Sequence, residues 1–220
     1  EDGALLVDVG GRLTQWAAFR HGRIAGSGAV PWGGAHLTAD LAHGLRIGLP
    51  EAEQAKRSRG VALCSLVEEA DPRALFEDGS PEQTPGLMAA ILEPRLEEIF
   101  TLVKKDLGDA YATSTLGAGI VLTGGGSRCR GTAALCEEVF DAPTRCRYLP
   151  SGLPGVERLG EGQWATALGL TLRAARGRGE PLSAAAVHDG EEAAGPLWRR
   201  LRGIFGRPGR RGSTGLAGEA

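Results

Sequence analysis

The segment Gly119-Ile120-Val121-Leu122-Thr123-Gly124-Gly125-Gly126-Ser127 decides how this sequence folds. Its first half is a short apolar run, which predicts a buried strand. Its three successive glycines leave bare backbone between that strand and a helix predicted over Thr132–Phe140. A flat base or a phosphate can approach such a backbone closely, and the helix N-terminus favours anions. A plain strand-to-helix turn rarely needs three glycines, so the segment favours a ligand-binding function.

A similar combination of strand and glycine turn stands at the start of the chain. Ala4–Val9 is an apolar run closed by Gly10 and Gly11, which predicts another buried strand. Asp8 stands near the end of that strand, where a carboxylate can hold the water shell of a metal ion. The backbone N–H groups of the turn can then face phosphate oxygens. Taken alone, this motif fits a strand that merely turns tightly equally well.

Glu53 and Lys56 form a third motif on a helix predicted over Pro50–Arg59. Residues three apart face the same side of a helix, so this acid and base can straddle a ribose. A solvated surface ion pair is the commoner explanation of such spacing.

The remaining patterns predict an α/β chain. Two further strands continue the first into a meander, and a long amphipathic helix runs from Pro85 to about Leu107. Pro94 should kink that helix or start a second one. A polar loop precedes it over 68–84. The other predicted elements are strands over 13–19, 23–30, 61–67 and 144–148, and helices over 36–45 and 163–175.

Composition excludes several classes of protein. The net charge of -2 argues against nucleic-acid binding by the whole chain. No stretch approaches the roughly 20 apolar residues that span a bilayer. Four cysteines, with no CxxC pair, lie in apolar segments and are expected to be reduced and buried in a cytosolic protein. The chain begins at Glu1 and runs at once into a strand, so we expect a fragment whose N-terminal half is missing.

The C-terminal region predicts a membrane contact. Residues 177–195 are rich in Gly, Glu, Ala and Ser, which is typical of a flexible linker. On a helical wheel of residues 196–207, the large apolar side chains occupy an arc of roughly 120° and the arginines lie outside it. The apolar residues are Leu197, Trp198, Leu201, Ile204 and Phe205, and the arginines are Arg199, Arg200, Arg202 and Arg207.

A helix of this length is marginal in water and should fold only on a surface. Each large apolar side chain contributes at most ~1.5–3 kcal/mol on burial, and each arginine near anionic lipid adds on the order of 1 kcal/mol. The sum favours reversible adsorption to a membrane. A basic nucleic-acid tail needs no apolar face, and a short helix packed back on the domain is the other alternative.

Together and in this order, the three motifs resemble the superfamily of actin, sugar kinases and heat-shock chaperones. Residues 8–14 are similar to its second phosphate loop and residues 119–127 to its adenosine loop, while Glu53 and Lys56 match the acid and base that flank the sugar. The resemblance implies an actin-like, ribonuclease H-like α/β lobe with a mixed five-stranded sheet and a small α/β subdomain. It also implies ATP, with Mg²⁺ held through Asp8, and as nucleotide-binding residues Asp8, Gly10, Gly11, Arg12, Thr14, Glu53, Lys56, Gly124, Gly125, Gly126 and Ser127.

Within that superfamily the sequence resembles the FtsA family of cell-division proteins. The Glu93-Pro94-Arg95 segment is fairly specific to that family, and the resemblance covers most of residues 1–176. It rests on Pro31–Ala42 (PWGGAHLTADLA), Ala52–Lys56 (AEQAK), Leu92–Ile99 (LEPRLEEI), Gly119–Ser127 and Ala165–Leu170 (ATALGL).

The resemblance implies the domain organisation. Residues 1–35 and 117–176 would form one subdomain and residues 36–116 a second, smaller one. The linker over 177–195, the membrane-targeting helix over 196–207 and a disordered tail over 208–220 would follow.

The resemblance also implies an adaptor role. Such a protein binds ATP, assembles into actin-like filaments and tethers the FtsZ ring to the cytoplasmic face of the inner membrane at the division septum. Its partners would be the C-terminal peptide of FtsZ, anionic lipids, further copies of itself and other division proteins, but no nucleic acid. Arg57, Arg59 and Lys104 are candidates for contacting the acids expected in the FtsZ peptide.

Two departures from the family pattern concern ATP. Arg12, Leu13 and Gln15 stand where the family usually has glycine, threonine and an acid, which removes the threonine that usually contacts phosphate. Cys129-Arg130-Gly131 replaces a usual Leu-Pro-Gly. Because the first phosphate loop lies outside this chain, we expect at most a weak ATPase in a longer protein and no hydrolysis by this chain alone.

Two other classes match part of the pattern. The lobe of an ATP-dependent kinase or chaperone should carry a substrate pocket and no lipid-seeking tail. The actin-like adaptor of type IV pilus assembly shares the glycine-rich loops but should lack both the Glu-Pro-Arg helix and the amphipathic terminus.

Overall fold

The computed structural model describes residues 3–67, 84–108, 116–146 and 164–177. The chain divides into two units, of which the first comprises Glu1–Ser151 and Gly155–Leu168. The second comprises Gly152–Pro154 and Gly169–Ala220. The sheet and most of the helices belong to the first unit.

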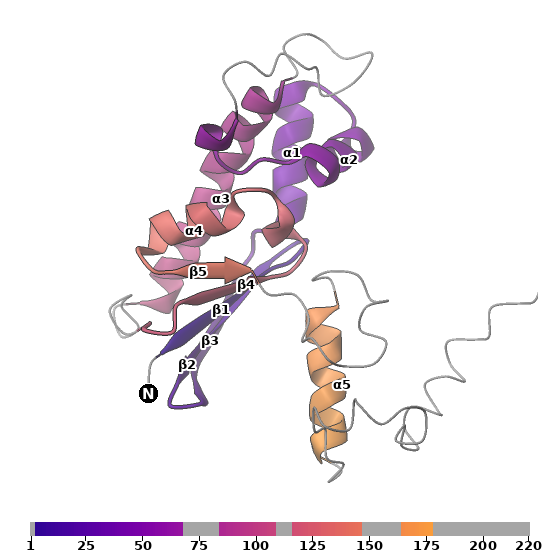
Figure 1. The fold of residues 1–220 in the computed structure, drawn as a ribbon. Coiled ribbons are helices and arrows are strands. Elements are labelled where there is room, and N and C mark those ends of the chain that lie inside the picture. The colour runs from indigo at the N-terminus through magenta and orange to yellow at the C-terminus, as the bar shows by residue number, and fades with distance from the viewer. Residues whose placement is uncertain (1–2, 68–83, 109–115, 147–163, 178–220) are drawn as a thin grey trace, which may run out of the picture. The chain divides into compact units, whose positions relative to one another are not determined.

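A mixed five-stranded sheet forms the base of the first unit (Figure 1). Its strand order is β3-β2-β1-β4-β5, with antiparallel pairing from β1 to β3 and parallel pairing from β1 to β5. The predicted meander and the mixed sheet are therefore confirmed. The strands are β1 (Ala4–Val9), β2 (Thr14–Arg20), β3 (Arg23–Val30), β4 (Ile120–Thr123) and β5 (Thr144–Cys146).

Strand β1 alternates buried and half-buried side chains because successive residues point to opposite faces. Leu5, Val7 and Val9 of β1 are fully buried on one face of the sheet. Parallel pairing places Asp8 beside Thr123, so the carboxyl ends of β1 and β4 lie next to each other. Ligands of open α/β sheets bind at such strand ends, and both glycine-rich turns begin there.

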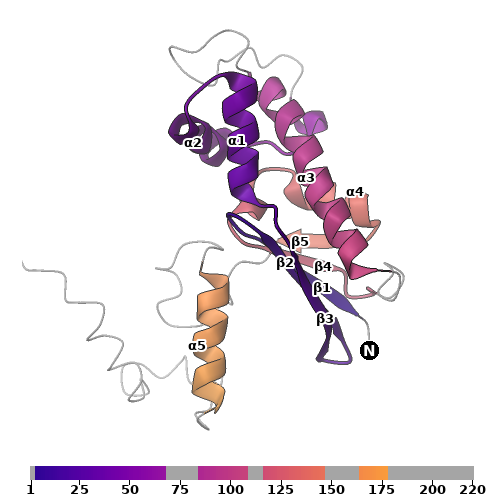
Figure 2. The same ribbon diagram turned by 180° about the vertical axis from the view of Figure 1, so that it is seen from behind.

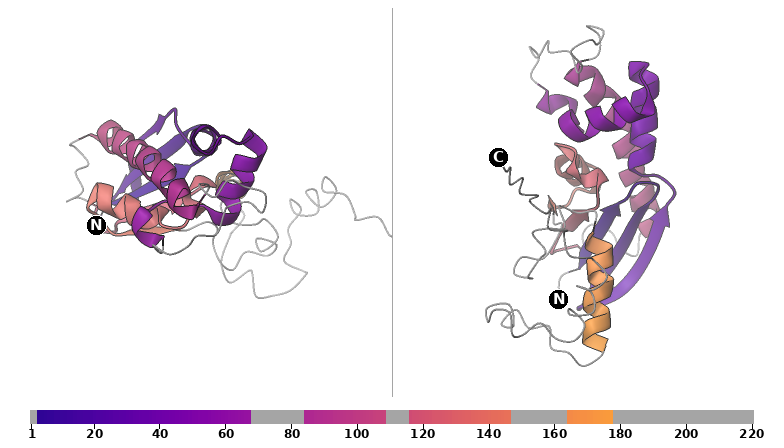
Figure 3. Two further views of the ribbon diagram at one scale, coloured as in Figure 1. Left: turned by 90° about the horizontal axis from the view of Figure 1, so that it is seen from above. Right: turned by 90° about the vertical axis from the view of Figure 1, so that its right-hand side faces the viewer.

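Five α-helices complete the described residues. They are α1 (Gly34–Leu45), α2 (Leu49–Arg59), α3 (Pro85–Leu107), α4 (Thr132–Phe140) and α5 (Ala165–Gly177). Short 3-10 turns lie at η1 (Cys64–Leu66) and η4 (Gly126–Arg128). The right-hand view in Figure 3 shows α1 and α2 at one end of the sheet.

Helix α3 provides much of the core. It runs from beside α1 down to the sheet (Figure 2). Thr84 caps its start, because the Leu87 N–H donates to the Thr84 hydroxyl, and Pro85 occupies the first turn. The apolar side of α3 packs against the strands, α1 and α4. Five of its large side chains are fully buried, and burial of each contributes about 1.5–3 kcal/mol. They are Leu92, Leu96, Ile99, Phe100 and Val103.

Helix α3 continues through Pro94, so the alternative that a second helix starts there was wrong, while a kink at Pro94 stays a prediction. A second local prediction was also wrong. Residues 61–67 are not a strand: Val61 forms one isolated bridge with Arg130, and Cys64–Leu66 form η1. Val61, Ala62 and Leu63 are buried, which explains the apolar character of the run. Residues 64–66, in contrast, are exposed.

The cysteines are free thiols, as expected, but they do not share one environment. Cys136 is buried, whereas Cys129 and Cys146 are half-buried. Burial raises the pKa of Cys129 and of Cys136 to about 12 in each case. Cys64 is exposed, so its predicted burial was wrong.

Several predictions fall outside the described residues. They concern the polar loop up to residue 83, the linker beyond Gly177, the helix over 196–207 and the tail over 208–220. The predicted boundaries of the two subdomains stay a prediction.

Candidate functional site

The triple glycine after β4 packs against the end of β1. A Cβ atom at Gly124 would lie 2.3 Å from Asp8 Oδ1 and 2.6 Å from the Val9 carbonyl oxygen. Gly124 also has φ = +84°, a conformation that side chains disfavour. A Cβ atom at Gly126 would lie 2.4 Å from Val9 Cγ1. The structure thus brings Asp8 and the triple glycine together, and only glycine fits this approach.

Gly125 differs from its two neighbours. It is exposed, and a Cβ atom there would have no heavy atom within 4 Å. The Ser127 side chain is buried and donates to the Gly124 carbonyl at 2.8 Å, which closes the turn. Gly125 therefore presents open backbone on the accessible side of the loop, as the approach of a base or phosphate requires.

Helix α1 holds the loop that follows β1. The Gly34 N–H donates to the Gly10 carbonyl at 2.9 Å, and the Ala35 N–H donates to the Gly11 carbonyl at 2.6 Å. Gly33 lies so close that a Cβ atom there would be 2.6 Å from the Gly10 oxygen. The first N–H groups of a helix lack partners within it, and here the loop carbonyls satisfy two of them.

Two predicted loop residues lie in opposite environments. Thr14 is fully buried and donates to the Trp32 carbonyl at 2.9 Å, so its side chain secures the segment before α1. Arg12 is exposed at the tip of the loop. The structure therefore leaves Arg12 accessible to a ligand and withdraws the Thr14 hydroxyl from one.

Glu53 and Lys56 pair with each other on α2. Lys56 Nζ lies 2.6 Å from Glu53 Oε2, and Arg57 Nε lies 2.6 Å from Glu53 Oε1. Thr38 of α1 also donates to Glu53 Oε2. Partial burial raises the pKa of Glu53, but the hydrogen bonds from Lys56, Thr38 and Arg57 outweigh it and lower the pKa to about 2. The carboxylate is thus held ionised.

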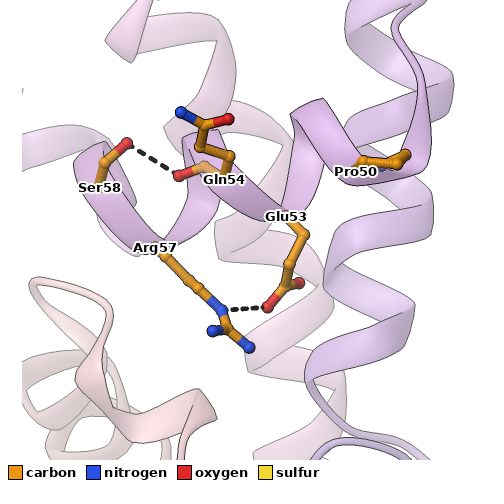
Figure 4. A pocket seen from close by; sticks show the side chains of 5 residues that line it. All are labelled: Pro50, Glu53, Gln54, Arg57 and Ser58. Carbon is orange, nitrogen blue, oxygen red and sulfur yellow. Dashed lines mark hydrogen bonds and ion pairs between the residues drawn. The ribbon is translucent and has the colours of Figure 1, made fainter. Parts of the chain in front are cut away.

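An open depression lies beside Glu53 on the surface of α2 (Figure 4). In Figure 4, Arg57 reaches Glu53, and the Ser58 hydroxyl bonds to the Gln54 carbonyl. The depression is lined by Pro50, Glu53, Gln54, Arg57 and Ser58. It exposes one edge of Glu53 to solvent.

Main-chain bonds connect α2 to the segment that follows the triple glycine. The Arg130 N–H donates to the Gly60 carbonyl at 3.1 Å, and the Ala62 N–H donates to the Arg130 carbonyl at 2.7 Å. Gly131 has φ = +92° and precedes α4. Cys129-Arg130-Gly131 therefore positions α2 through its backbone. The unusual side chains of this segment leave that role intact.

Sequence reasoning missed two threonines beside Asp8. Thr123 is 5% exposed, and its hydroxyl has no hydrogen-bond partner. Thr166, in the first turn of α5, donates to Asp8 Oδ2 at 3.0 Å. The parallel pairing of β1 with β4 is the signal that could have identified Thr123, since the two apolar runs end in Asp8-Val9 and Leu122-Thr123.

The residues present fit a magnesium ion of the kind that accompanies a nucleotide. Such an ion keeps several waters and binds one or two carboxylates together with phosphate oxygens. Asp8 supplies one carboxylate near the end of β1, beside the triple glycine. No three metal-ligating side chains cluster in the parts of the chain that the structure describes, so a cage made wholly of protein ligands is not formed there.

The three candidates for a peptide contact do not form one patch. Arg57 and Arg59 are exposed on α2. Lys104 lies in the last turn of α3 and donates to the Val139 carbonyl at 2.7 Å. In Figure 2, α2 lies at the end of the helices away from the sheet, whereas the last turn of α3 lies beside the sheet.

Comparisons with known sequences all point to one family. The profile of the family described as "Cell division protein FtsA" matches residues 5–169. Cell division protein FtsA of Pseudomonas aeruginosa is 31% identical over 210 residues, covering 92% of this chain and 50% of that protein. FtsA of Neisseria meningitidis is 32% identical over 206 residues, covering 91% and 50%. The chain thus spans about half the length of the curated relatives it matches.

Comparison with solved structures shows an actin-like fold. MreB5 of Spiroplasma citri bound to ADP has a TM-score of 0.58 and 21% identity, and the match covers 78% of this chain and 53% of that protein. A chain of the PilM–PilN type IV pilus biogenesis complex has a TM-score of 0.56 and 20% identity, covering 78% and 46%. At these identities the likeness concerns the fold alone. Among the described helices, none is long and apolar enough to cross a bilayer.

Proposed function

Since this chain belongs to the FtsA family of cell division proteins, we propose that it binds ATP and tethers the FtsZ ring to the membrane. It would supply one lobe of the nucleotide clamp and the membrane-binding end of the adaptor. The observation that carries the proposal is the meeting of Asp8 and the triple glycine at adjacent strand ends, within a chain of this family.

The geometry supports nucleotide binding by this lobe. Gly125 offers open backbone, Asp8 offers a carboxylate for a hydrated Mg²⁺, and Glu53 presents an ionised carboxylate at the edge of an open depression. Bound Mg²⁺ would neutralise phosphate charge. Asp8 would orient the metal's waters, while Thr166 and Thr123 adjoin Asp8 from α5 and β4.

Membership of the FtsA family and the pattern of residues 196–207 support the proposed membrane tether. The apolar arc and the flanking arginines of that segment favour adsorption to anionic lipid.

The proposed partners follow from the same family. The C-terminal peptide of FtsZ would bind the subdomain that contains α1 to α3, and further copies of the chain would assemble into filaments. Filament assembly would multiply weak contacts between tails and lipid. The protein would act at the cytoplasmic face of the inner membrane, at the division septum, together with other division proteins.

Vesicle flotation tests the tether. The full chain and a chain that ends at Ala194 are mixed with vesicles of anionic phospholipid and centrifuged through a density gradient. The full chain should float and the shortened chain should stay at the bottom. Equal flotation of the two would contradict the tether and leave the kinase or chaperone class as the better explanation.

A further inference from the structure

The turn between β1 and β2 leaves hydrogen-bond donors unused on its outer side. The Gly10 N–H donates to the Leu13 carbonyl at 3.1 Å and closes the turn, while the Gly10 and Gly11 carbonyls accept from the first N–H groups of α1. In contrast, the N–H groups of Gly11 and Arg12 donate to no other residue that the structure describes. Both residues are exposed, so these two donors are open to a ligand.

The Arg12 side chain adds further donors at the same place. Its guanidinium group forms no ion pair or hydrogen bond with any residue in the described part of the chain. A guanidinium group carries five N–H donors in a planar fork that matches the oxygens of a phosphate group. Successive backbone N–H groups in a turn also favour an anion. The outer side of this turn therefore has the chemistry of a phosphate site.

The side chains at the neighbouring strand ends carry little negative charge. Strand pairing places Gln15 and Thr123 on either side of Asp8, with all three side chains on one face of the sheet. Gln15 is neutral and exposed, and the buried Thr123 hydroxyl has no hydrogen-bond partner. Because the charges of Arg12 and Asp8 cancel, these four side chains together present no net negative charge to a phosphate group.

We propose that Arg12 binds a phosphate group of the nucleotide directly, so that ATP binding by this chain depends little on Mg²⁺. This inference rests on the proposed nucleotide-binding function and concerns how the phosphate charge is compensated. Glycine, which the family usually has at this position, supplies no charge. Asp8 keeps its proposed role toward a hydrated metal ion, and Arg12 takes over part of the charge compensation.

The turn is already held in the shape that such binding needs. The Gly34 and Ala35 N–H groups bond to its two glycine carbonyls at 2.9 and 2.6 Å, which fixes the inner side of the turn to α1. On the outer side, a Cβ atom at Gly11 would have no heavy atom within 4 Å, so a phosphate group has room there. A backbone ordered before binding does not have to be ordered by the ligand, which favours affinity.

ATP titration with and without a chelator tests the role of Arg12. The affinity of the full chain for ATP is measured by calorimetry in Mg²⁺ and again in excess EDTA, and the parent should bind with similar affinity in both. R12M should weaken ATP binding in EDTA by about tenfold, the effect of losing a hydrogen bond between charged groups. The loss should be smaller in Mg²⁺, because a metal ion then also compensates the phosphate charge.

R23M is the matched control. It removes the same charge from an exposed arginine at the hairpin end of β2 and β3, whereas Arg12 precedes the opposite end of β2. R23M should leave the affinity for ATP in EDTA unchanged. A parent chain that binds ATP only in Mg²⁺ would overturn the proposal, and so would equal losses in R12M and R23M.

Inorganic pyrophosphate separates this inference from the proposed function. If the parent chain binds ATP under neither condition, the proposed nucleotide function fails. Titration of the ¹⁵N-labelled full chain with pyrophosphate in EDTA then decides whether the turn binds phosphate groups. The Gly11 and Arg12 amide signals should shift in the parent and much less in R12M. The absence of shifts in the parent, or equal shifts in both proteins, would overturn the proposal.

Discussion

Arg95 of α3 forms a two-point contact with Asp40 of α1: Nε lies 2.5 Å from Oδ2 and Nη2 lies 3.2 Å from Oδ1. The guanidinium group also lies over the ring of Trp32, 4.7 Å from its centroid. The pKa of Arg95 is raised chiefly by the hydrogen bond to Asp40. Arg95 thus joins α3 to α1 and to the segment before α1.

The neighbouring residues give the Glu93-Pro94-Arg95 segment a physical explanation. Glu93 accepts from the Cys64 N–H at 2.6 Å and holds η1 against α3. Pro94 is exposed, so its ring displaces no core side chain. The acid and the base on either side of the proline therefore fasten two different segments to one helix.

Replacing Arg95 with methionine should lower the free energy of unfolding by about 1–2 kcal/mol, because a partly buried ion pair and a cation–π contact are lost together. Urea denaturation followed by fluorescence measures it. The matched control is E98Q, since Glu98 also pairs with Arg95 but is 47% exposed; it should change stability much less. Equal losses in the two variants would contradict the brace between α1 and α3.

Gly124 and Gly125 should respond oppositely to alanine. G124A places a Cβ atom 2.3 Å from Asp8 Oδ1 at a positive φ, and should cost about 2 kcal/mol or more. G125A meets no atom within 4 Å and should stay within about 0.5 kcal/mol of the parent. Thermal denaturation of both variants checks this. If G124A is as stable as G125A, the triple glycine does not pack against the end of β1.

Most of the fold could be predicted because its apolar periodicity is strong. The meander and the buried side of α3 follow from residue patterns, and the mixed sheet followed from the family resemblance. The run Val61-Ala62-Leu63 was wrongly predicted to be part of a strand, because an apolar, buried run does not distinguish a strand from a single bridge followed by a turn. Helix α3 does not end at Pro94, because an exposed proline can be accommodated in a helix whose opposite side is anchored in the core.

The candidate site was less predictable at the level of single side chains. Spacing brought Glu53 and Lys56 to one side of α2, but spacing says nothing about Gly34 and Thr38, which come from another helix and saturate Lys56. Thr14 sits in a segment that resembles a phosphate site, yet its hydroxyl donates to the carbonyl of Trp32, a residue distant in sequence. Contacts between distant segments are invisible to local patterns.

The contribution of Glu53 to the stability of the fold should depend on pH. Its folded pKa is about 2, below the ordinary 4.5, so its contribution is fully present above pH 4.5 and is lost as the pH falls toward 2. The difference in unfolding free energy between the parent and E53Q should therefore shrink over this interval. Urea titrations at several acidic pH values measure it. A difference that stays constant from pH 4.5 downward would show that Glu53 is not held by these cations.

Cys64 should be exposed yet slow to react. The hydrogen bond with Glu93 raises the pKa of the Cys64 thiol, which lowers the fraction of reactive thiolate near neutral pH. E93Q should speed alkylation of Cys64 by iodoacetamide severalfold, as peptide mapping by mass spectrometry can measure. The control E97Q, an exposed acid on the same helix, should leave the rate unchanged. Equal rates in parent and E93Q would contradict the contact between Glu93 and η1.

Co-flotation of a labelled FtsZ C-terminal peptide with the chain on anionic vesicles tests the adaptor role most directly. The peptide should reach the vesicle fraction only when the chain is present, and a chain carrying both W198D and F205D should leave peptide and protein at the bottom of the gradient. If the chain floats while the peptide stays at the bottom, this half of the protein does not connect FtsZ to the membrane.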